Sequence, residues 1–378
     1  MFQPKTWDFD ERPLVVIWEI TRACALACKH CRAEAIPHRN PLELTTEEGY
    51  RLMDQVRELG SPVFVLTGGD PLMRPDFYDL IRYGTSIGLR VSSSPSGTAL
   101  VKREAMRKAA EAGLRRVSFS LDGASAETHD AFRKVRGSFD WTMNGIRYAR
   151  EAGMEVQINT TISRYSIGEL EDIARLVEEL GAVLWSLFFL VPVGRGVAED
   201  LVSPEEHERV LRWAWELSGR VPFAVKTTEA PFYRRVALQM GGELPGPARV
   251  APGRGDGAAG GAPTYAPDIP LPGRFGSYGV NDARGFVFIS HIGEVCPSGF
   301  LPLVAGNVRE QPLAKIYRES PLFRELRNPD LLKGKCGVCE YRFVCGGSRA
   351  RAWALTGDHL ASDPSCVYVP PAARAAAG

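Results

Sequence analysis

The amino-acid sequence predicts an α/β protein in which six repeated β/α units share one parallel sheet. Short β-rich runs alternate with amphipathic helical segments from residue 14 to residue 217. At 378 residues the chain is also long enough for a second domain beyond this array. Six units form either an open doubly wound sheet or an incomplete barrel, and the periodicity alone leaves both open.

The strands and helices of this array follow from composition and spacing. Six runs have the β-branched and aromatic composition of buried strands: 14–20, 62–67, 89–94, 115–121, 155–161 and 183–191. Two of the intervening helices begin with a capping box, Thr45 with Glu48 and Ser203 with Glu206. In both candidate folds the loops after the strands carry the ligand site, so the functional residues are expected there. Beyond residue 280, the runs "GFVFIS" and "GEVCPSGF" predict a β-hairpin.

The overall composition is that of a globular protein with balanced charge. The 46 basic and 45 acidic side chains leave a net charge of +1, which indicates neither a nucleic-acid-binding nor a membrane-surface protein. The charged N-terminus does not resemble a signal peptide, and no apolar run reaches the roughly 18 residues of a membrane span, so we expect a cytoplasmic protein. Gly, Pro and Ala dominate residues 241–280, which predicts a flexible connector. We therefore expect a core at 1–220, a connecting segment at 221–280 and a C-terminal domain at 281–370.

The eight cysteines fall into two groups, one near the start of the chain and one beyond residue 295. In a reducing compartment, clustered thiols are more often metal ligands or catalytic groups than disulfides. Cys24, Cys28 and Cys31 follow the first strand with the spacing Cys-x3-Cys-x2-Cys. Soft thiolates suit zinc or an iron-sulfur cluster, and three of them leave one position open on a four-iron cluster. The alternatives are a zinc site completed by His30 or His38 and a set of buried, unliganded thiols.

This three-cysteine loop after the first strand of a β/α array resembles that of the radical S-adenosylmethionine (SAM) superfamily. The resemblance implies a partial (β/α)6 TIM-like barrel in which Cys24, Cys28 and Cys31 hold a [4Fe-4S] cluster whose open iron binds SAM. It further implies an enzyme that cleaves SAM reductively to a 5′-deoxyadenosyl radical, which abstracts hydrogen from a substrate. A reductant such as ferredoxin or flavodoxin would supply the electron. In such an enzyme the cofactor carries the difficult chemistry, and the protein supplies position and shielding from water.

Two further loops carry residues that the resemblance assigns to SAM. "TGGD" follows the second strand where the family usually has Gly-Gly-Glu, so Gly68, Gly69 and Asp70 would receive the SAM amino group. "SLDG" follows the fourth strand, where Ser120 and Asp122 would contact the SAM ribose or carboxylate. Taken alone, "GGD" is an ordinary turn, and Asp122 is equally a helix N-cap.

The fifth and sixth strands supply the remaining candidate SAM contacts. In "QINTT", Gln157 and Asn159 point to the same face of the strand, because side chains alternate with period two. Their amides would reach the SAM carboxylate or ribose. Arg195 in "VPVGRG" is a candidate anion contact, and the apolar residues beside it would face the adenine.

The C-terminal cysteines resemble the SPASM/twitch extension of radical SAM enzymes. Four of them have the spacing Cys-x2-Cys-x5-Cys followed by one more after twenty residues: Cys336, Cys339, Cys345 and Cys366. Four thiolates suit zinc or a [4Fe-4S] cluster, and the resemblance implies one auxiliary [4Fe-4S] cluster. Ser348 and Arg349 stand in "CGGSR" where a cysteine of a second auxiliary cluster would lie. Cys296 is left over, as a ligand, a substrate contact or a buried small hydrophobe.

The runs "WEITRAC", "QINTTI" and "GGSRARAWALTGD" resemble a subgroup of anaerobic haem-synthesis decarboxylases and peptide maturases. The resemblance implies oxidative modification, for example decarboxylation, of a tetrapyrrole or a ribosomally made peptide. Ser348 departs from the haem enzymes, which tend to keep a cysteine there, whereas no leader-peptide-binding domain precedes the first strand.

The stretch "KTTEAPFYRR" is the candidate substrate contact outside the six units. This stretch contains Lys226, Glu229, Arg234 and Arg235. Their side chains either contact carboxylates of the substrate or belong to the solvated start of a helix, and we favour the helix start. A hypothesis of another class is a non-catalytic, zinc-stabilised β/α binding module.

Overall fold

The computed structural model describes residues 8–60, 62–241 and 280–375. The predicted connector falls largely on residues 242–279 and there lies outside the described residues. The strands, in chain order, are β1 (Val15–Glu19), β2 (Val63–Thr67), β3 (Arg90–Ser93), β4 (Arg116–Ser120), β5 (Glu155–Ile162), β6 (Leu184–Phe189), β7 (Ala224–Thr228), β8 (Phe286–Ile289), β9 (Glu294–Cys296) and β10 (Gly306–Asn307). They form a 10-stranded sheet with the order β10-β9-β8-β1-β2-β3-β4-β5-β6-β7.

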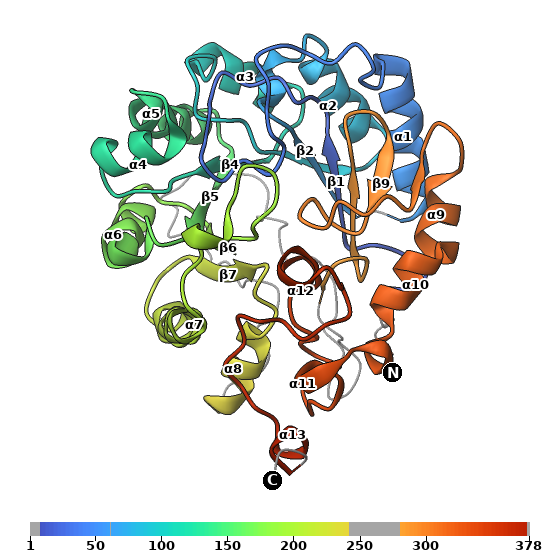
Figure 1. Cartoon of the computed structure of the whole chain (residues 1–378). Helices are drawn as coiled ribbons and strands as arrows, with labels where there is room; N and C mark the ends of the chain where they lie inside the picture. The colour runs from blue at the N-terminus through green and yellow to red at the C-terminus, as the bar shows by residue number, and fades with distance from the viewer. Residues whose placement is uncertain (1–7, 61, 242–279, 376–378) are drawn as a thin grey trace, which may run out of the picture.

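Helices cover the outside of this sheet, which curves into an incomplete barrel (Figure 1). The helices, in chain order, are α1 (Thr46–Glu58), α2 (Phe77–Ser86), α3 (Arg103–Glu111), α4 (Ala126–Arg133), α5 (Ser138–Glu151), α6 (Leu170–Glu179), α7 (Pro204–Ser218), α8 (Tyr233–Gln239), α9 (Leu313–Glu319), α10 (Pro321–Arg327), α11 (Gly334–Gly337), α12 (Arg349–Thr356) and α13 (Pro371–Ala375). In the part of the chain that the structure describes, no helix is long and apolar enough to cross a membrane.

The six predicted strands are confirmed, each within two residues of its expected bounds, and they pair in parallel with their chain neighbours. Both capping boxes are also present: Thr45 and Ser203 accept from the backbone N–H groups of Glu48 and Glu206, whose side chains reach back. The partial barrel is therefore the correct one of the two architectures left open by the sequence.

The stretch "KTTEAPFYRR" is not a solvated helix start, and our preference for that interpretation was wrong. Its first residues belong to β7, which pairs in parallel with β6 and extends the barrel past residue 220. The β-branched run "AVKTT" supports a strand, and α8 begins only at Tyr233.

The predicted C-terminal hairpin is confirmed as β8 and β9, and it lies on the barrel rather than apart from it. β8 pairs in parallel with β1, with Val15 opposite Phe286. The buried ion pair between Arg351 and Asp363 (3.2 Å) holds α12 beside the barrel, since Arg351 also donates to the carbonyl of Glu229 (2.7 Å). The division of the chain into three segments stays a prediction.

Candidate active site

A cavity of about 680 Å³ lies inside the barrel. Inward-facing residues of the parallel strands and the loops at their carboxyl ends line it, together with residues around Ser298 from the C-terminal part. Ligand pockets of small molecules typically measure roughly 300–1,000 Å³, so this space is large enough for a cofactor and part of a substrate.

The three-cysteine loop is held at its base by backbone hydrogen bonds. The N–H of Cys24 donates to the carbonyl of Ile36 (2.9 Å), and Ala23 bridges to the same residue, which closes the loop between residues 23 and 36. The N–H of Asp70 donates to the carbonyl of Ala23 (2.6 Å), and that of Gly69 to Thr21 (2.8 Å). The loop after β2 therefore fixes the position of the cysteine loop.

All three cysteines of this loop line the cavity, and protein donors surround their sulfur atoms. The N–H of Leu26 donates to Cys24 Sγ (3.3 Å), and Arg133 Nη1 lies 3.6 Å from Cys28 Sγ. Hydrogen bonds and positive charge of this kind stabilise thiolates on an iron-sulfur cluster.

Gly69 and Gly194 allow the neighbouring loops to approach the cysteine loop. A Cβ on Gly69 would lie 2.4 Å from the carbonyl oxygen of Ala23, and one on Gly194 would lie 2.6 Å from that of Cys31. Gly194 also has φ +61°, which other residues rarely adopt. Gly69 thus lies directly against the cysteine loop, and both Gly68 and Gly69 line the cavity. Their predicted contact with the SAM amino group stays a prediction.

Asp70 lies behind the cavity wall and is not exposed. Its carboxylate accepts from Thr98 Oγ1 (2.7 Å) and from the N–H of Leu72 (3.2 Å), and burial raises its pKa to about 6. In the structure this side chain ties the loop after β3 to the loop after β2. A direct contact with the SAM amino group stays a prediction, and the backbone of Gly68 and Gly69 is the part of this motif that reaches the cavity.

Asp122 is also buried behind the wall, and it is not the N-cap of the following helix, since Ser125 caps α4. The carboxylate pairs with Arg133 and accepts from the N–H of Thr161 (2.7 Å). Arg133, the histidines His30 and His129 and the N–H of Thr161 keep the pKa of Asp122 below its ordinary value, although burial alone would raise it. Asp122 thus orients Arg133 between the fourth strand and Cys28.

The other predicted SAM contacts are brought together on the cavity wall. Ser120, Gln157 and Asn159 face it from β4 and β5, and Gln157 Nε2 donates to Asn159 Oδ1 (2.7 Å). Arg195 donates to the carbonyls of Cys28 (2.9 Å) and Ala35 (3.2 Å), and its Nη2 has no partner among the described residues. Arg195 therefore braces the cysteine loop and keeps one donor for an anion.

Of the two histidines that could complete a zinc site, His38 is exposed, whereas His30 lines the cavity with the three cysteines and stacks on Phe132 with ring centroids 4.5 Å apart. Burial lowers the pKa of His30 to about 4. A single zinc ion would draw its thiolates to within roughly 4 Å of one another. Within the described ranges, no three His, Cys, Asp or Glu side chains form such a group. A four-iron cluster is a larger body and its ligands lie farther apart.

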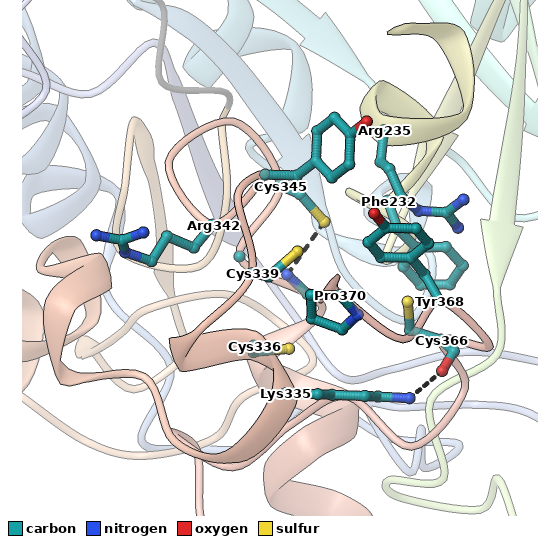
Figure 2. A pocket seen from close by; sticks show the side chains of 13 residues that line it. Phe232, Arg235, Lys335, Cys336, Cys339, Arg342, Cys345, Cys366, Tyr368 and Pro370 are labelled. Carbon is teal, nitrogen blue, oxygen red and sulfur yellow. Dashed lines mark hydrogen bonds between the residues drawn. The ribbon is translucent and has the colours of Figure 1, made fainter. Parts of the chain in front are cut away.

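The second cysteine group lines a separate pocket at the C-terminal end of the chain. Figure 2 shows the sulfur atoms of the four predicted ligands around a common space, beside the rings of Phe232 and Tyr368: Cys336, Cys339, Cys345 and Cys366. All eight cysteines are free thiols. Burial raises the pKa of Cys339 to about 11 and that of Cys345 to about 12, so a cationic centre is needed to hold these groups as thiolates. The donor set and its arrangement fit an iron-sulfur cluster.

Cys296 lines neither pocket. It is 5% exposed on β9, and burial raises its pKa to about 12. Of the three predicted alternatives, this placement favours the buried small hydrophobe.

Two cavity residues, Arg133 and Ser96, were not predicted to act there, and a third, Lys226, was named only in the less favoured of two alternatives. Arg133 comes from α4, and no local pattern marked it, because Cys28 lies in another unit and Asp122 lies 11 residues earlier, in the loop before α4. Ser96 lies in the loop "SPSGT", whose position after the third strand was a usable signal. Lys226 was named but assigned to solvent, and the β-branched residues next to it were the overlooked signal.

The cavity wall carries more positive than negative charge. Its six cationic side chains are Arg32, Arg116, Arg133, Arg195, Lys226 and Arg234. Arg32, Arg116 and Arg133 pair with carboxylates that do not line the cavity. Among the described residues, Arg195, Lys226 and Arg234 have no carboxylate partner. The two carboxyl groups on the wall, Glu229 and Asp282, both have a pKa raised by burial, which favours their neutral forms.

Comparison with known proteins agrees with this fold and site. The family model described as the Radical SAM superfamily matches residues 18–177. AdoMet-dependent heme synthase of Methanosarcina barkeri is 42% identical over 358 residues, which cover 95% of this chain and 97% of that protein. Fe-coproporphyrin III synthase of the same organism is 33% identical (94% and 88% covered), and mycofactocin maturase MftC of Mycobacterium ulcerans is 30% identical (94% and 88% covered). The crystal structure of Streptococcus suis SuiB bound to S-adenosylmethionine has a TM-score of 0.69 at 14% identity, with 95% of this chain and 78% of that chain covered.

In this barrel of parallel strands, the first loop presents three cysteines to the central cavity. Together with the match to the family model, this arrangement defines an enzyme that uses an iron-sulfur cluster and SAM. The chain belongs to the radical SAM superfamily. The relatives named above match 94–95% of this chain.

Proposed function

We propose that this enzyme oxidatively removes carboxyl groups from the side chains of a tetrapyrrole. The observation that carries the proposal is the excess of positive charge on the cavity wall, because a tetrapyrrole intermediate carries several carboxylates. The full-length similarity to AdoMet-dependent heme synthase supports it. A peptide substrate is the other class among the relatives, and no feature of the cavity favours it.

Cys24, Cys28 and Cys31 hold the [4Fe-4S] cluster in this proposal. SAM would be held by the backbone of Gly68 and Gly69 and by the polar side chains of Ser120, Gln157, Asn159 and Arg195, all of which line the cavity. When bound, this pair of cofactors abstracts a hydrogen atom from the substrate side chain, and a ferredoxin or flavodoxin supplies the electron that starts it. The surrounding strands exclude water from the reacting carbon.

The four C-terminal cysteines hold one auxiliary [4Fe-4S] cluster. Loss of a propionate carboxyl as CO₂, with formation of a vinyl group, requires removal of one hydrogen atom and one electron, and an auxiliary cluster can accept that electron. Anaerobic reconstitution is expected to give about eight irons per chain, and Cys345→Ala about four. Bound zinc, or four irons in both proteins, would contradict this assignment.

Lys226 is the anchor for a substrate carboxylate. Its side chain is exposed and lines the cavity, and desolvation there and the positive charge of Arg116 lower its pKa. Lys226→Met keeps the length of the side chain and removes its charge, so we expect iron-coproporphyrin III to bind about tenfold more weakly. The control is Lys315→Met on the exposed side of α9, which is expected to bind like the wild type.

The activity test combines the reconstituted enzyme, SAM, dithionite and iron-coproporphyrin III without oxygen. Mass spectrometry is expected to show loss of CO₂ and two hydrogen atoms from each modified side chain, with one 5′-deoxyadenosine formed for each. The methyl ester of the same tetrapyrrole, which has no free carboxylate, serves as the negative control. SAM cleavage with an unchanged tetrapyrrole would refute the proposed substrate.

A further inference from the structure

Glu229 directly follows β7, at the carboxyl end of the barrel where the cysteine loop also lies. Its backbone has φ +58°, a left-handed conformation that is unfavourable for a residue with a Cβ. The buried guanidinium of Arg351 holds this conformation by donating to the Glu229 carbonyl (2.7 Å). Backbone strain that the surroundings maintain in this way is concentrated at functional sites.

The side chain of Glu229 is oriented by a second contact from α12. Ser348 Oγ lies 2.6 Å from Glu229 Oε2 and also accepts from the N–H of Arg351 (3.1 Å) as the N-cap of α12. Because the serine hydroxyl has one proton, we assign that proton to the bond with Oε2. Oε2 is thereby an acceptor, and Oε1, which has no protein partner within the described residues, is the oxygen left for the cavity that Glu229 lines.

The environment of Glu229 favours a protonated carboxyl group. Its pKa is raised to about 8, first by burial in the wall and then by the neighbouring Asp282 and Asp363. Ser348 and Arg351 act in the opposite direction, but Arg351 is already paired with Asp363. With Oε2 accepting from Ser348, the proton of the acid form is on Oε1.

We propose that Glu229 Oε1 donates a hydrogen bond to a carboxylate oxygen of the tetrapyrrole, as a specificity-determining contact at the α12 side of the cavity. The contact deepens the proposed function and rests on it. An ionised Glu229 would repel a substrate carboxylate, so binding requires the acid form, whereas Lys226 attracts a carboxylate elsewhere on the wall. Ser348 and Arg351 are positioning residues for this contact.

The test is the pH dependence of iron-coproporphyrin III binding, followed by absorbance without SAM, so that no radical chemistry is needed. With a pKa of about 8, the wild-type Kd is expected to rise about tenfold between pH 7 and pH 9. Glu229→Gln keeps a neutral donor and cannot ionise, so its Kd is expected to rise less than that of the wild type over this range. The control is Glu178→Gln on the exposed face of α6, which is expected to follow the wild type.

Ser348→Ala provides a second variant if Glu229→Gln folds poorly. It removes a hydrogen bond that favours ionised Glu229, so the rise in Kd is expected to move to higher pH. Infrared titration of the protein without tetrapyrrole reports the same group, as a carboxylic acid band that weakens above pH 8 and is smaller in Glu229→Gln than in the wild type. The same pH dependence in Glu229→Gln and wild type would overturn this contact and leave the proposed function intact. Failure of wild type to bind the tetrapyrrole at any pH would overturn both.

Discussion

Arg133 shows how a single side chain connects two parts of the site. It pairs with Asp122, which is bound to the backbone of β5, and its Nη1 lies 3.6 Å from Cys28 Sγ. Neither neighbour is close to it in sequence. The positive charge beside the cluster ligand favours the form of the cluster that carries the extra electron.

Arg133→Gln is therefore expected to lower the reduction potential of the SAM-binding cluster by tens of millivolts, on the order of 1 kcal/mol. The measurement is a redox titration followed by electron paramagnetic resonance. Arg136→Gln, an exposed change three residues away, is the control and is expected to leave the potential unchanged. Equal potentials in both variants would show that Arg133 has only a packing role.

At the scale of elements, the loops of the barrel hold one another through backbone contacts. The loop after β6 lies against the cysteine loop, where the N–H of Arg195 donates to the carbonyl of Cys31 (3.1 Å). Gly194 makes this approach possible, because a Cβ at this position would lie 2.6 Å from the carbonyl oxygen of Cys31.

Gly194→Ala is expected to push these two loops apart, with a loss of stability of about 1–3 kcal/mol and reduced retention of the first cluster. Thermal unfolding and the iron content after reconstitution measure the two effects. The matched control is Gly168→Ala, where the added methyl meets nothing within 4 Å. A Gly194→Ala protein with full iron content would contradict this role.

The sequence predicted the strands of the barrel well, because the hydrophobic pattern of each β/α unit lies in consecutive residues and does not depend on distant parts of the chain. It predicted the cysteines and the inward face of β5 for the same reason. The roles of Asp70 and Asp122 could not be predicted, since their partners Thr98 and Thr161 lie 28 and 39 residues away. Lys226 was misjudged because its place on the cavity wall depends on β7 joining β6, a pairing that a five-residue run only weakly indicates.

At the scale of the whole molecule, Arg351 connects the cysteine-rich end to the barrel. It is fully buried, pairs with Asp363 and donates to the end of β7. Asp363 in turn accepts from the N–H of Ser348 (2.9 Å), so the Arg351–Asp363 ion pair connects the start of α12 to the residue after β7.

Arg351→Ala leaves Asp363 buried without its partner, so the free energy of unfolding is expected to fall by about 3–5 kcal/mol. Denaturant unfolding of the reconstituted protein measures this loss. Arg82→Ala breaks an exposed ion pair with Asp79 and is expected to cost less than about 1 kcal/mol. Similar losses in the two variants would mean that the buried pair does not fasten the C-terminal segment.

The pairing of β8 with β1 has a consequence for synthesis on the ribosome. β1 is made first, but the strand that covers its outer edge, beginning at Phe286, is made about 270 residues later. At roughly 5–20 residues per second, the edge of β1 stays open for a time on the order of tens of seconds. During that interval an apolar strand with unpaired backbone groups is available to other chains. The nascent protein is therefore most exposed to aggregation, and most dependent on chaperones, before its last quarter has emerged.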